Sequence, residues 1–221
     1  PLSNLGKIRQ GIAENPRCIS KRLNERHGNR WQVGEGVFAL REEELERLKL
    51  SSDEKRLLKP YYTLADLGRY YIAAKPSLRL IYATRDTCPE IKLYPNIYHH
   101  LARFRPIMEA RRETRKGSNA WWHLHWPRQQ ALWIAPKILC VQMARRPTFV
   151  CMARPAYVSF SVNVFVPFAK TREALTYITG VLNSRLLWRW YEHRAKRRGV
   201  GLEINGNVLC RTPIRTIDFS D

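Results

Sequence analysis

The chain has 221 residues, which is long enough to bury a hydrophobic core in one large domain or two small ones. Hydrophobic residues make up 44% of it, including seven Trp, ten Tyr and seven Phe, and this content excludes a disordered basic tail. Lys and Arg number 39 against 19 Asp and Glu, and the formal net charge of +20 indicates a polyanionic partner, most commonly nucleic acid.

The cysteines and the hydropathy pattern indicate a reduced, cytoplasmic protein. The five cysteines are odd in number and scattered, and none forms a C-x-x-C pair, which disfavours both a disulfide framework and a zinc ribbon. The sequence contains no apolar run of membrane-spanning length and no signal peptide, so no membrane association is expected. Because the chain begins at Pro1 and not at Met, we expect it to be a piece of a longer protein.

The N-terminal half predicts short strands and short helices. Acidic residues in the first turn of 42–50 favour a helix there, and Ser51 is a suitable N-cap for the next helix. Ile97, Leu101 and Phe104 fall on one face of a helix that begins at Pro95. Strands are expected at 7–12, 31–40 and 78–82, and helices at 42–50, at 51–60, from Pro89, at 95–104 and from Pro106 through Arg115.

The C-terminal half predicts longer strands and one long helix. Segment 156–168 alternates apolar with polar residues, which is typical of a strand with one buried face. Thr171 is the expected cap of a helix at 172–194 with Leu186 in its apolar stripe, and a basic end follows at Arg194–Arg198. Strands are expected at 132–143, 148–153, 156–168 and 208–217.

This order of elements predicts an α+β fold: a twisted, mostly antiparallel or mixed sheet with flanking helices and a long C-terminal helix. We expect residues 1–221 to act as one domain, which could divide into sub-lobes at about 1–75 and 76–221. Charge is uneven along it: residues 1–54 hold nine of the acids, whereas 101–154 hold eleven Lys and Arg against two acids. Such asymmetry indicates one basic face.

Segment 111–137 combines cations with a cluster of tryptophans. Arg111, Arg112, Arg115 and Lys116 precede a turn, and Trp121, Trp122 and Trp126 then surround two histidines. Cationic donors beside flat aromatic faces suit a surface that meets phosphate and base. The alternative is a Trp-rich core edge with solvated arginines around it, and the tryptophans themselves fit that structural role better.

Motifs for catalysis and metal binding are weak or missing. His123 and His125 have the spacing of metal ligands on a strand, but no supporting ligand stands nearby in the sequence, so packing is favoured and no metal site is expected. Asp66 or Asp86 with Glu90-x-Lys92 leaves a magnesium-dependent nuclease open as an alternative. No nucleophile motif, dinucleotide loop or Walker-type phosphate loop is present, so no catalytic residue is assigned.

The central part of the chain carries four motifs in a fixed order: YPNIYHHL (94–101), RR with RKG (111–117), WWHLHWPR (121–128) and PKI (136–138). Further motifs on either side agree in order: KIRQGI (7–12), LKPYYTLADLGRYYI (58–72), LIY (80–82), YITGVLNSRLLWRWY (177–191), Gly199-x-Gly201 and TPI (212–214). Together these motifs resemble one family, the TaqI-like C-terminal specificity (target recognition) domain fused to adenine-N6 DNA methyltransferases, including bacterial type IIG restriction-modification enzymes. The resemblance covers nearly the whole chain, and its LNS segment is also similar to type I specificity subunits.

This resemblance implies sequence-specific binding of double-stranded DNA without catalysis. The methyltransferase signature Asn-Pro-Pro-Tyr/Phe is absent, since Asn15-Pro16 is followed by Arg17, and no glycine-rich S-adenosylmethionine motif occurs. The fragment is therefore expected to hold no cofactor and to be no enzyme. Its parent is expected to be a DNA adenine-N6 methyltransferase (EC 2.1.1.72), with S-adenosylmethionine bound in a covalently linked N-terminal domain. A basic RNA-binding or protein-binding module remains an alternative.

The candidate DNA-binding residues fall into two groups. Lys and Arg contact phosphates and fix the register, whereas Arg and Gln can read base edges in the major groove. The expected phosphate contacts are Arg111, Arg112, Arg115, Lys116, Lys137, Arg145, Arg146, Lys196, Arg197 and Arg198, and the candidate base readers are Arg128, Gln129 and Gln130.

Overall fold

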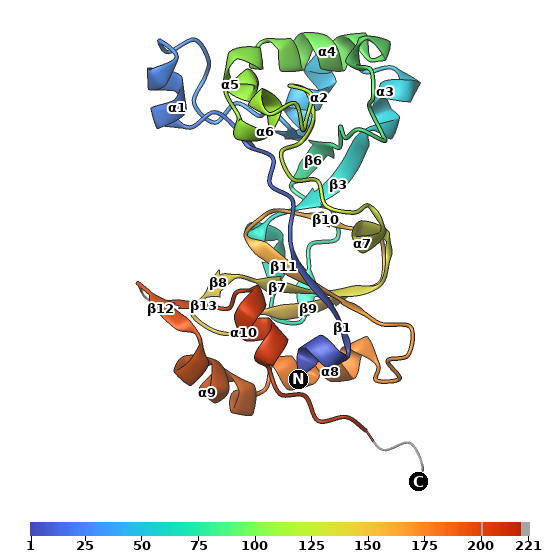
Figure 1. The fold of residues 1–221 in the computed structure, drawn as a ribbon, viewed down its shortest axis with the longest axis vertical. Helices are drawn as coiled ribbons and strands as arrows, with labels where there is room; N and C mark the ends of the chain where they lie inside the picture. The colour runs from blue at the N-terminus through green and yellow to red at the C-terminus, as the bar shows by residue number, and fades with distance from the viewer. Residues whose placement is uncertain (200, 218–221) are drawn as a thin grey trace. The chain divides into compact units, whose positions relative to one another are not determined.

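The computed structural model describes residues 1–199 and 201–217 and divides into two compact units (Figure 1). Unit 1 contains Pro1–Gly11, Tyr62–Lys75 and the described residues from Gln129 onward, and unit 2 contains Ile12–Tyr61 and Pro76–Arg128. The chain thus passes between the units near residues 11, 61, 75 and 128, of which the sequence predicts only the one near 75.

Unit 1 is built on a four-stranded antiparallel sheet in the order β1–β11–β7–β9 (Figure 1). Its strands are β1 (Gly6–Gln10), β11 (Val162–Pro167), β7 (Lys137–Val141) and β9 (Phe149–Met152). Phe165 of β11 pairs with Ile8 on one side and with Ile138 on the other. The residues Val162–Phe165 of β11 are all buried, and since successive side chains point to opposite faces, both faces of this central strand are covered there.

Helices gathered at one side of this sheet complete the core of unit 1 (Figure 1). They are η1 (Leu2–Asn4), α8 (Leu175–Leu182), α9 (Arg185–Arg194) and α10 (Gly206–Arg211). Their buried side chains, among them Ile178, Leu187 and Leu209, pack with Ile138 and Phe165 of the sheet. The smaller elements of unit 1 are η2 (Leu64–Asp66), β4 (Leu67–Gly68), β5 (Tyr71–Ile72), α7 (Ala131–Ile134), β8 (Met143–Ala144), β10 (Tyr157–Val158), β12 (Lys196–Arg198) and β13 (Gly201–Glu203).

Unit 2 combines short antiparallel strands with short helices. β2 (Ala39–Leu40) and β3 (Leu58–Tyr62) both pair with β6 (Leu78–Ile81). The helices are α1 (Lys21–Arg26), α2 (Glu42–Leu48), α3 (Ser52–Arg56), η3 (Ile91–Leu93), α4 (Pro95–Ala102), α5 (Arg105–Glu109) and α6 (Arg112–Arg115). Ile97, Leu101 and Phe104 are fully buried, as the predicted apolar stripe requires, together with Phe38 and Leu80.

The predicted α+β fold class is confirmed, and so are most of the short elements of the N-terminal half. Ser51 caps α3, because its hydroxyl accepts the backbone N–H of Glu54 at 3.3 Å. The α3 helix ends at Arg56, however, and Pro60 lies in β3. The predicted strand at 31–40 is reduced to β2, and Pro89 precedes only the short helix η3. The helix expected from Pro106 is broken into α5 and α6, with extended backbone at Arg111.

The single helix predicted at 172–194 is wrong, because two helices, α8 and α9, lie there. Asn183 stands between them fully buried, and its amide bonds the backbone N–H and carbonyl of Phe149 at 3.1 and 2.8 Å. Ser184 then caps α9. The break turns the second helix, so that Leu187 is buried while Leu186 is 78% exposed. Thr171 is not a cap and instead donates a hydrogen bond to the carbonyl of Leu5.

Three predicted strands also differ. Residues 131–134 form α7, so the strand predicted at 132–143 begins only at Lys137. Segment 156–168 is interrupted at 159–161, which leaves Phe160 exposed and Asn163 buried, with the amide of Asn163 donating to the carbonyl of Ile204 at 2.9 Å. The predicted strand at 208–217 is replaced at its start by α10, which Asn205 caps. Among the described residues, no helix is long and apolar enough to cross a membrane.

Candidate nucleic-acid interface

A small three-stranded sheet in unit 1 gathers exposed cations. β12 pairs with β13, and β13 pairs with β8, both antiparallel. The register places Lys196 opposite Glu203 and Glu203 opposite Met143, and Arg198 shares this face by alternation along the strand. Met143 is exposed, whereas Leu202, which alternates to the other face, belongs to the core of the unit. The face that carries Lys196 and Arg198 therefore points outward.

Two further cations extend this surface at the turn that follows β8. Arg145 and Arg146 are both exposed, and the guanidinium of Arg146 lies 4.8 Å from the ring centroid of Trp188 on α9. Arg198 forms an ion pair with Glu203 at 2.6 Å. We call Arg145, Arg146 and Lys196–Arg198 the basic sheet. Segments distant in the chain thus bring five predicted phosphate contacts together on one small sheet.

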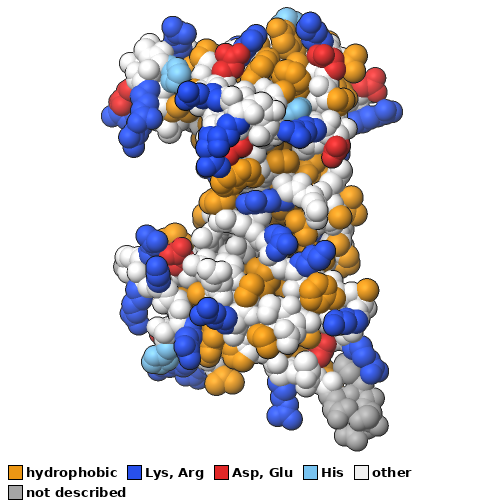
Figure 2. Space-filling model, viewed as in Figure 1, with side chains coloured by type: hydrophobic (Ala, Val, Ile, Leu, Met, Phe, Trp, Pro, Cys, Tyr) orange, Lys and Arg blue, Asp and Glu red, His pale blue; other side chains and the backbone are white. Residues whose placement is uncertain are grey.

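The neighbouring helix α9 adds positive charge. Arg185, Arg189 and Arg194 are exposed on it, and Arg189 pairs with Glu192 at 2.9 Å. A cavity of about 410 Å³ nearby is lined by Trp190, Arg194, Asn207, Val208, Arg211 and Pro213. Figure 2 shows Lys and Arg side chains gathered over β12, β13 and α9. The segments of unit 1 contain 18 Lys and Arg against six Asp and Glu, so unit 1 carries most of the net charge.

Arg111 is buried and cannot contact a phosphate, so its predicted role is wrong. Its Nε donates to the carbonyl of Met108 at 3.0 Å, and its Nη2 donates to the carbonyl of Trp121 at 2.7 Å. Its Nη1 reaches the carbonyl of Asn15 at 3.3 Å. Burial lowers the pKa of the guanidinium to about 10, although the Glu113 carboxylate opposes that shift. Arg111 therefore ties together backbone segments inside unit 2.

Lys137 is also buried, with 0% of its surface exposed, so its predicted phosphate contact is wrong as well. Its Nζ donates to the carbonyl of Trp133 at 2.9 Å and to the carbonyl of Arg154 at 3.4 Å. Burial lowers the pKa of the ammonium to about 8. Lys137 thus holds the end of α7 near the start of β7.

The buried Lys137 predicts a specific pH dependence of stability. Its folded pKa is about 8, below the ordinary 10.5, so above pH 8 the unfolded chain retains a proton that the folded chain has released. We expect the free energy of unfolding of the wild type to rise relative to Lys137→Met by about 2–3 kcal/mol between pH 7 and pH 10. Urea unfolding at both pH values measures this. The exposed Lys170→Met is the control, and an equal rise against both variants would contradict the prediction.

Three of the predicted cations remain candidates in unit 2. Arg112, Arg115 and Lys116 are exposed on α6 and just after it. Arg112 pairs with Glu113 at 2.7 Å, which orients its side chain. Gly117 follows with a φ of +71° and open space around it, so the chain turns away at an exposed corner.

The three candidate base readers are consecutive residues at the point in the sequence where unit 2 ends and unit 1 resumes. Arg128 is the last residue of unit 2, with a left-handed φ of 61°, and its guanidinium lies 5.5 Å from the ring centroid of the partly exposed Trp126. Gln129 and Gln130 are exposed in unit 1 immediately before α7. The amide of Gln130 donates to the hydroxyl of Tyr157 at 3.3 Å. A backbone in the left-handed region is uncommon for a residue other than glycine, and such strained conformations are often found at functional sites.

The tryptophans and histidines of the central segment are mainly structural. Trp121 is buried, and Trp122 donates its indole N–H to the carbonyl of Cys88 at 3.0 Å. His123 lies with Nε2 3.1 Å from the same carbonyl, and burial lowers its pKa. His125 Nδ1 lies 3.2 Å from the Glu113 carboxylate. These contacts match the packing role that the sequence favours.

The carboxylates of the alternative nuclease motif serve as caps. The Asp66 carboxylate accepts the backbone N–H of Thr63 at 2.6 Å, and the Glu90 carboxylate accepts the backbone N–H of Lys92 at 3.1 Å. Asp66 belongs to unit 1, whereas Glu90 and Asp86 belong to unit 2. Within residues 1–199 and 201–217, no group of three His, Cys, Asp or Glu side chains is placed to hold a metal ion.

A second basic segment is missed by the sequence analysis. Residues 17–30 contain five Lys and Arg against one Glu, and three of the five lie on α1. Asn24 fixes this segment, since its amide donates to the carbonyl of Trp31 at 2.7 Å and its oxygen accepts the Trp31 N–H at 3.0 Å. A count of charged residues over 17–30 alone shows the positive charge of this segment. A count over 1–54 does not show it, because the acids of 42–54 offset the cations.

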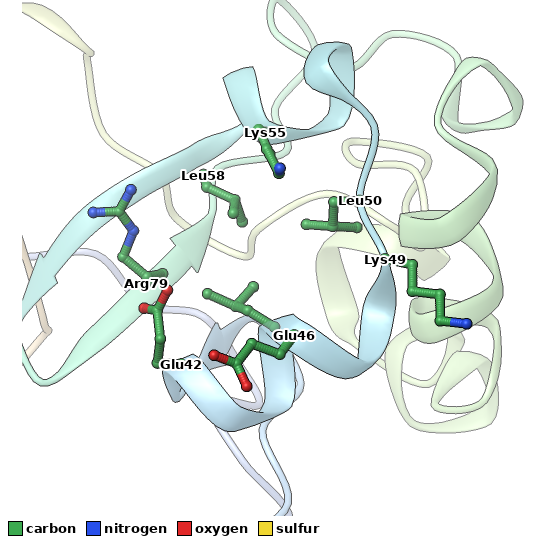
Figure 3. A pocket seen from close by; sticks show the side chains of 8 residues that line it. Glu42, Glu46, Lys49, Leu50, Lys55, Leu58 and Arg79 are labelled. Atoms are coloured by element: carbon green, nitrogen blue, oxygen red, sulfur yellow. The ribbon is translucent and has the colours of Figure 1, made fainter.

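A pocket in unit 2 offers no comparable charge preference. It has a volume of about 350 Å³ and an apolar floor that includes Leu50 and Leu58 (Figure 3). Glu42 and Glu46 project from α2 at its rim, and Lys49, Lys55 and Arg79 also line it. Since two acids and three bases line the pocket, it does not select a polyanion.

Comparison with known proteins gives a likeness of fold. No protein-family model matches the chain, and no curated protein matches it. A solved structure does match: the type IIL restriction-modification enzyme MmeI in complex with DNA, with a TM-score of 0.64 and 12% sequence identity. The match covers 96% of this chain and 25% of that chain, so this chain spans about a quarter of the length of MmeI. Nearly all of the chain therefore shares its fold with part of a restriction-modification enzyme.

Proposed function

We propose that this chain binds double-stranded DNA sequence-specifically, as the specificity domain of a restriction-modification enzyme. The observation that carries the proposal is the basic sheet, which brings exposed cations from two distant segments together in a chain of net charge +20. The likeness of fold to an enzyme solved with DNA supports it. Fold alone does not imply function, and so the cationic surface is the stronger argument.

The candidate residues include cations, which suit phosphates, and glutamine amides, which suit base edges. This combination supports sequence-specific DNA binding over a general attraction to polyanions. Arg145, Lys196 and Arg197 are exposed and suited to phosphates, which fix the position of the protein on the duplex. Gln129 and Gln130 are exposed, and a glutamine amide can pair with the edge of an adenine in the major groove.

The finer assignment follows the TaqI-like resemblance and is part of the same proposal. The parent is a bacterial, cytoplasmic type IIG adenine-N6 DNA methyltransferase, and a covalently linked N-terminal domain binds S-adenosylmethionine. The chain itself is not an enzyme. Methylation of adenine in a duplex requires the base to leave the stack, so a second domain that holds the DNA is mechanically necessary.

Selection from a randomised pool of DNA duplexes tests the proposal. Duplexes retained by the 221-residue chain are sequenced after washing at low and at moderate salt, with an A-form RNA duplex as competitor. We expect one enriched motif that persists as salt is raised, and weak competition by the RNA, because its major groove is too narrow for base readout. Binding without a motif, lost steeply with salt, would reduce the function to general polyanion binding. Stronger binding to the RNA would favour an RNA-binding module.

A further inference from the structure

A two-residue hairpin in unit 1 presents two neighbouring tyrosines to solvent. β4 and β5 pair through Leu67 with Ile72 and through Gly68 with Tyr71, so Arg69 and Tyr70 form the turn. Tyr70 is 61% exposed and Tyr71 is 65% exposed. Large aromatic side chains are rarely left so open in pairs, because each ring gains free energy when it is buried.

The hairpin holds these rings in a demanding conformation. Tyr70 has a φ of +72°, in the left-handed region where turns normally use Gly or Asn, and a bulky residue there is strained. A Cβ added at Gly68 would lie 1.9 Å from the Tyr71 ring, so that ring lies directly against the Gly68 backbone. Strain that a glycine would relieve points to a function for the tyrosine itself.

The turn is firmly attached to the body of unit 1. The guanidinium of Arg69 donates to the carbonyl of Asn183 and lies 5.4 Å from the Tyr70 ring centroid. The backbone N–H of Tyr70 reaches the carbonyl of Phe149 at 3.4 Å. Arg154 donates to the carbonyl of Ala74 at 2.8 Å just beyond β5. The rings are therefore presented by an anchored turn and not by a loose loop.

The same contacts connect the tyrosines with the basic sheet. Tyr70 bonds to Phe149 in β9, and Arg145 and Arg146 lie in the turn that leads into β9. Asn183, which Arg69 contacts, ends α8 just before the helix whose Trp188 lies under Arg146. The tyrosine turn and the basic sheet are thus linked through β9 and through the junction of α8 and α9.

We propose that the Tyr70–Tyr71 turn contacts DNA through its rings and stacks on the face of an unpaired nucleobase. This inference rests on the proposed function and deepens it by naming the ligand of this surface. Base–aromatic stacking needs no sequence, because every base has a π-face, and cations beside the ring hold the strand. An adenine-N6 methyltransferase creates an unpaired base when it extrudes its target.

A nucleic acid fits this surface better than a protein partner. The cations that accompany the tyrosines are Arg69, Arg145, Arg146 and Arg154, and the nearest acid in the same segment, Asp66, is buried in its cap with Thr63. A partner protein would more commonly meet an apolar patch with mixed charges at its rim. The contacts of the turn thus involve arginines, whereas the acid of its own segment is buried, and this charge is complementary to phosphate.

Binding of two matched duplexes tests the inference. One duplex is fully paired, and the other is identical except for one unpaired 2-aminopurine, whose fluorescence reports stacking. With the 221-residue chain, we expect about tenfold tighter binding to the second duplex and quenching of the probe. The double variant Tyr70→Gly/Tyr71→Ser should lose both effects. Because glycine relieves the positive φ at residue 70, the thermal stability of this variant should not fall.

The control variant Tyr70→Phe/Tyr71→Phe keeps the rings and should keep both the preference and the quenching. Retention of the preference by the Gly/Ser variant overturns the inference, as does equal binding of the two duplexes by the wild type. In both of those cases the paired duplex is still bound, and the proposed function stands. Failure to bind either duplex at low salt overturns both proposals. A change in self-association alone, measured by sedimentation, would make the turn a protein contact and overturn the inference.

Discussion

Replacing Arg145, Lys196 and Arg197 with glutamine is expected to weaken binding to every DNA duplex by roughly 10- to 100-fold, about 0.5–0.9 kcal/mol for each cation. These three are exposed in the basic sheet, and their removal leaves the Arg198–Glu203 ion pair and the Arg146–Trp188 contact in place. Each lost phosphate contact releases one fewer counterion, so the slope of log affinity against log salt should fall by about 0.9 per contact. Fluorescence anisotropy over about 50 to 200 mM salt measures both quantities.

A second triple variant serves as the control, because it removes the same total charge at positions outside the basic sheet. Lys7, Lys170 and Arg215 are exposed cations of the same unit outside the basic sheet, and replacing them with glutamine removes the same charge. We expect this control to change affinity by a small factor and to leave the salt slope almost unchanged. If the two triple variants lose affinity equally, the attraction is a property of net charge, and the basic sheet is not the interface.

Replacing Glu54 with alanine is expected to destabilise unit 2 by about 3–5 kcal/mol, an effect of the size seen when a buried charge partner is removed. Glu54 is 0% exposed. Its carboxylate accepts the backbone N–H groups of Ser51 at 2.8 Å, Asn96 at 2.7 Å and Ile97 at 3.1 Å, as well as the Asn96 amide at 2.8 Å. It thereby caps α3 and also binds the N-terminus of α4, where the helix dipole favours an anion.

Urea unfolding measures this loss, with the exposed Glu46→Ala as control, for which we expect a change within about 0.5 kcal/mol. The pH dependence gives a second test. Burial raises the pKa of Glu54, but the hydrogen bonds from Asn96, Ser51 and Ile97 outweigh it, and the pKa lies below its ordinary 4.5. The stabilisation is therefore complete above pH 4.5 and is lost as pH falls toward the folded pKa, so the difference between wild type and Glu54→Gln should shrink in acid. A difference independent of pH would contradict the assignment.

Local chemistry explains the elements that the sequence predicts well. Ser51 before an acidic first turn, and Pro95 before the stripe of Ile97, Leu101 and Phe104, each specify a helix through neighbouring residues alone. The errors occur where distant contacts intervene. The continuous apolar pattern of 172–194 favours one helix, but Asn183 bonds to Phe149 in β9 and splits it. No residue near Asn183 in sequence indicates that partner.

In the candidate interface, too, some features follow from neighbouring residues and others from contacts between distant segments. Composition identifies a cationic protein, and the charge runs identify Arg145, Arg146 and Lys196–Arg198, but their meeting on one sheet depends on the pairing of β13 with β8. Arg111 and Lys137 look like their exposed neighbours in sequence, and yet both are buried against backbone carbonyls. The sequence shows that a residue is Lys or Arg, whereas the exposure of its side chain depends on which other segments pack over it.

The sequence by itself therefore determined the α+β class, the strong positive charge and short helices such as α2, α3 and α4, because caps, periodicity and composition act over a few residues. The tertiary structure decided the discontinuous division into two units, the basic sheet and the exposed Tyr70–Tyr71 turn. These features arise from strand pairing and burial between segments far apart in the chain. Such contacts form only when the whole core is assembled, and no local pattern records them.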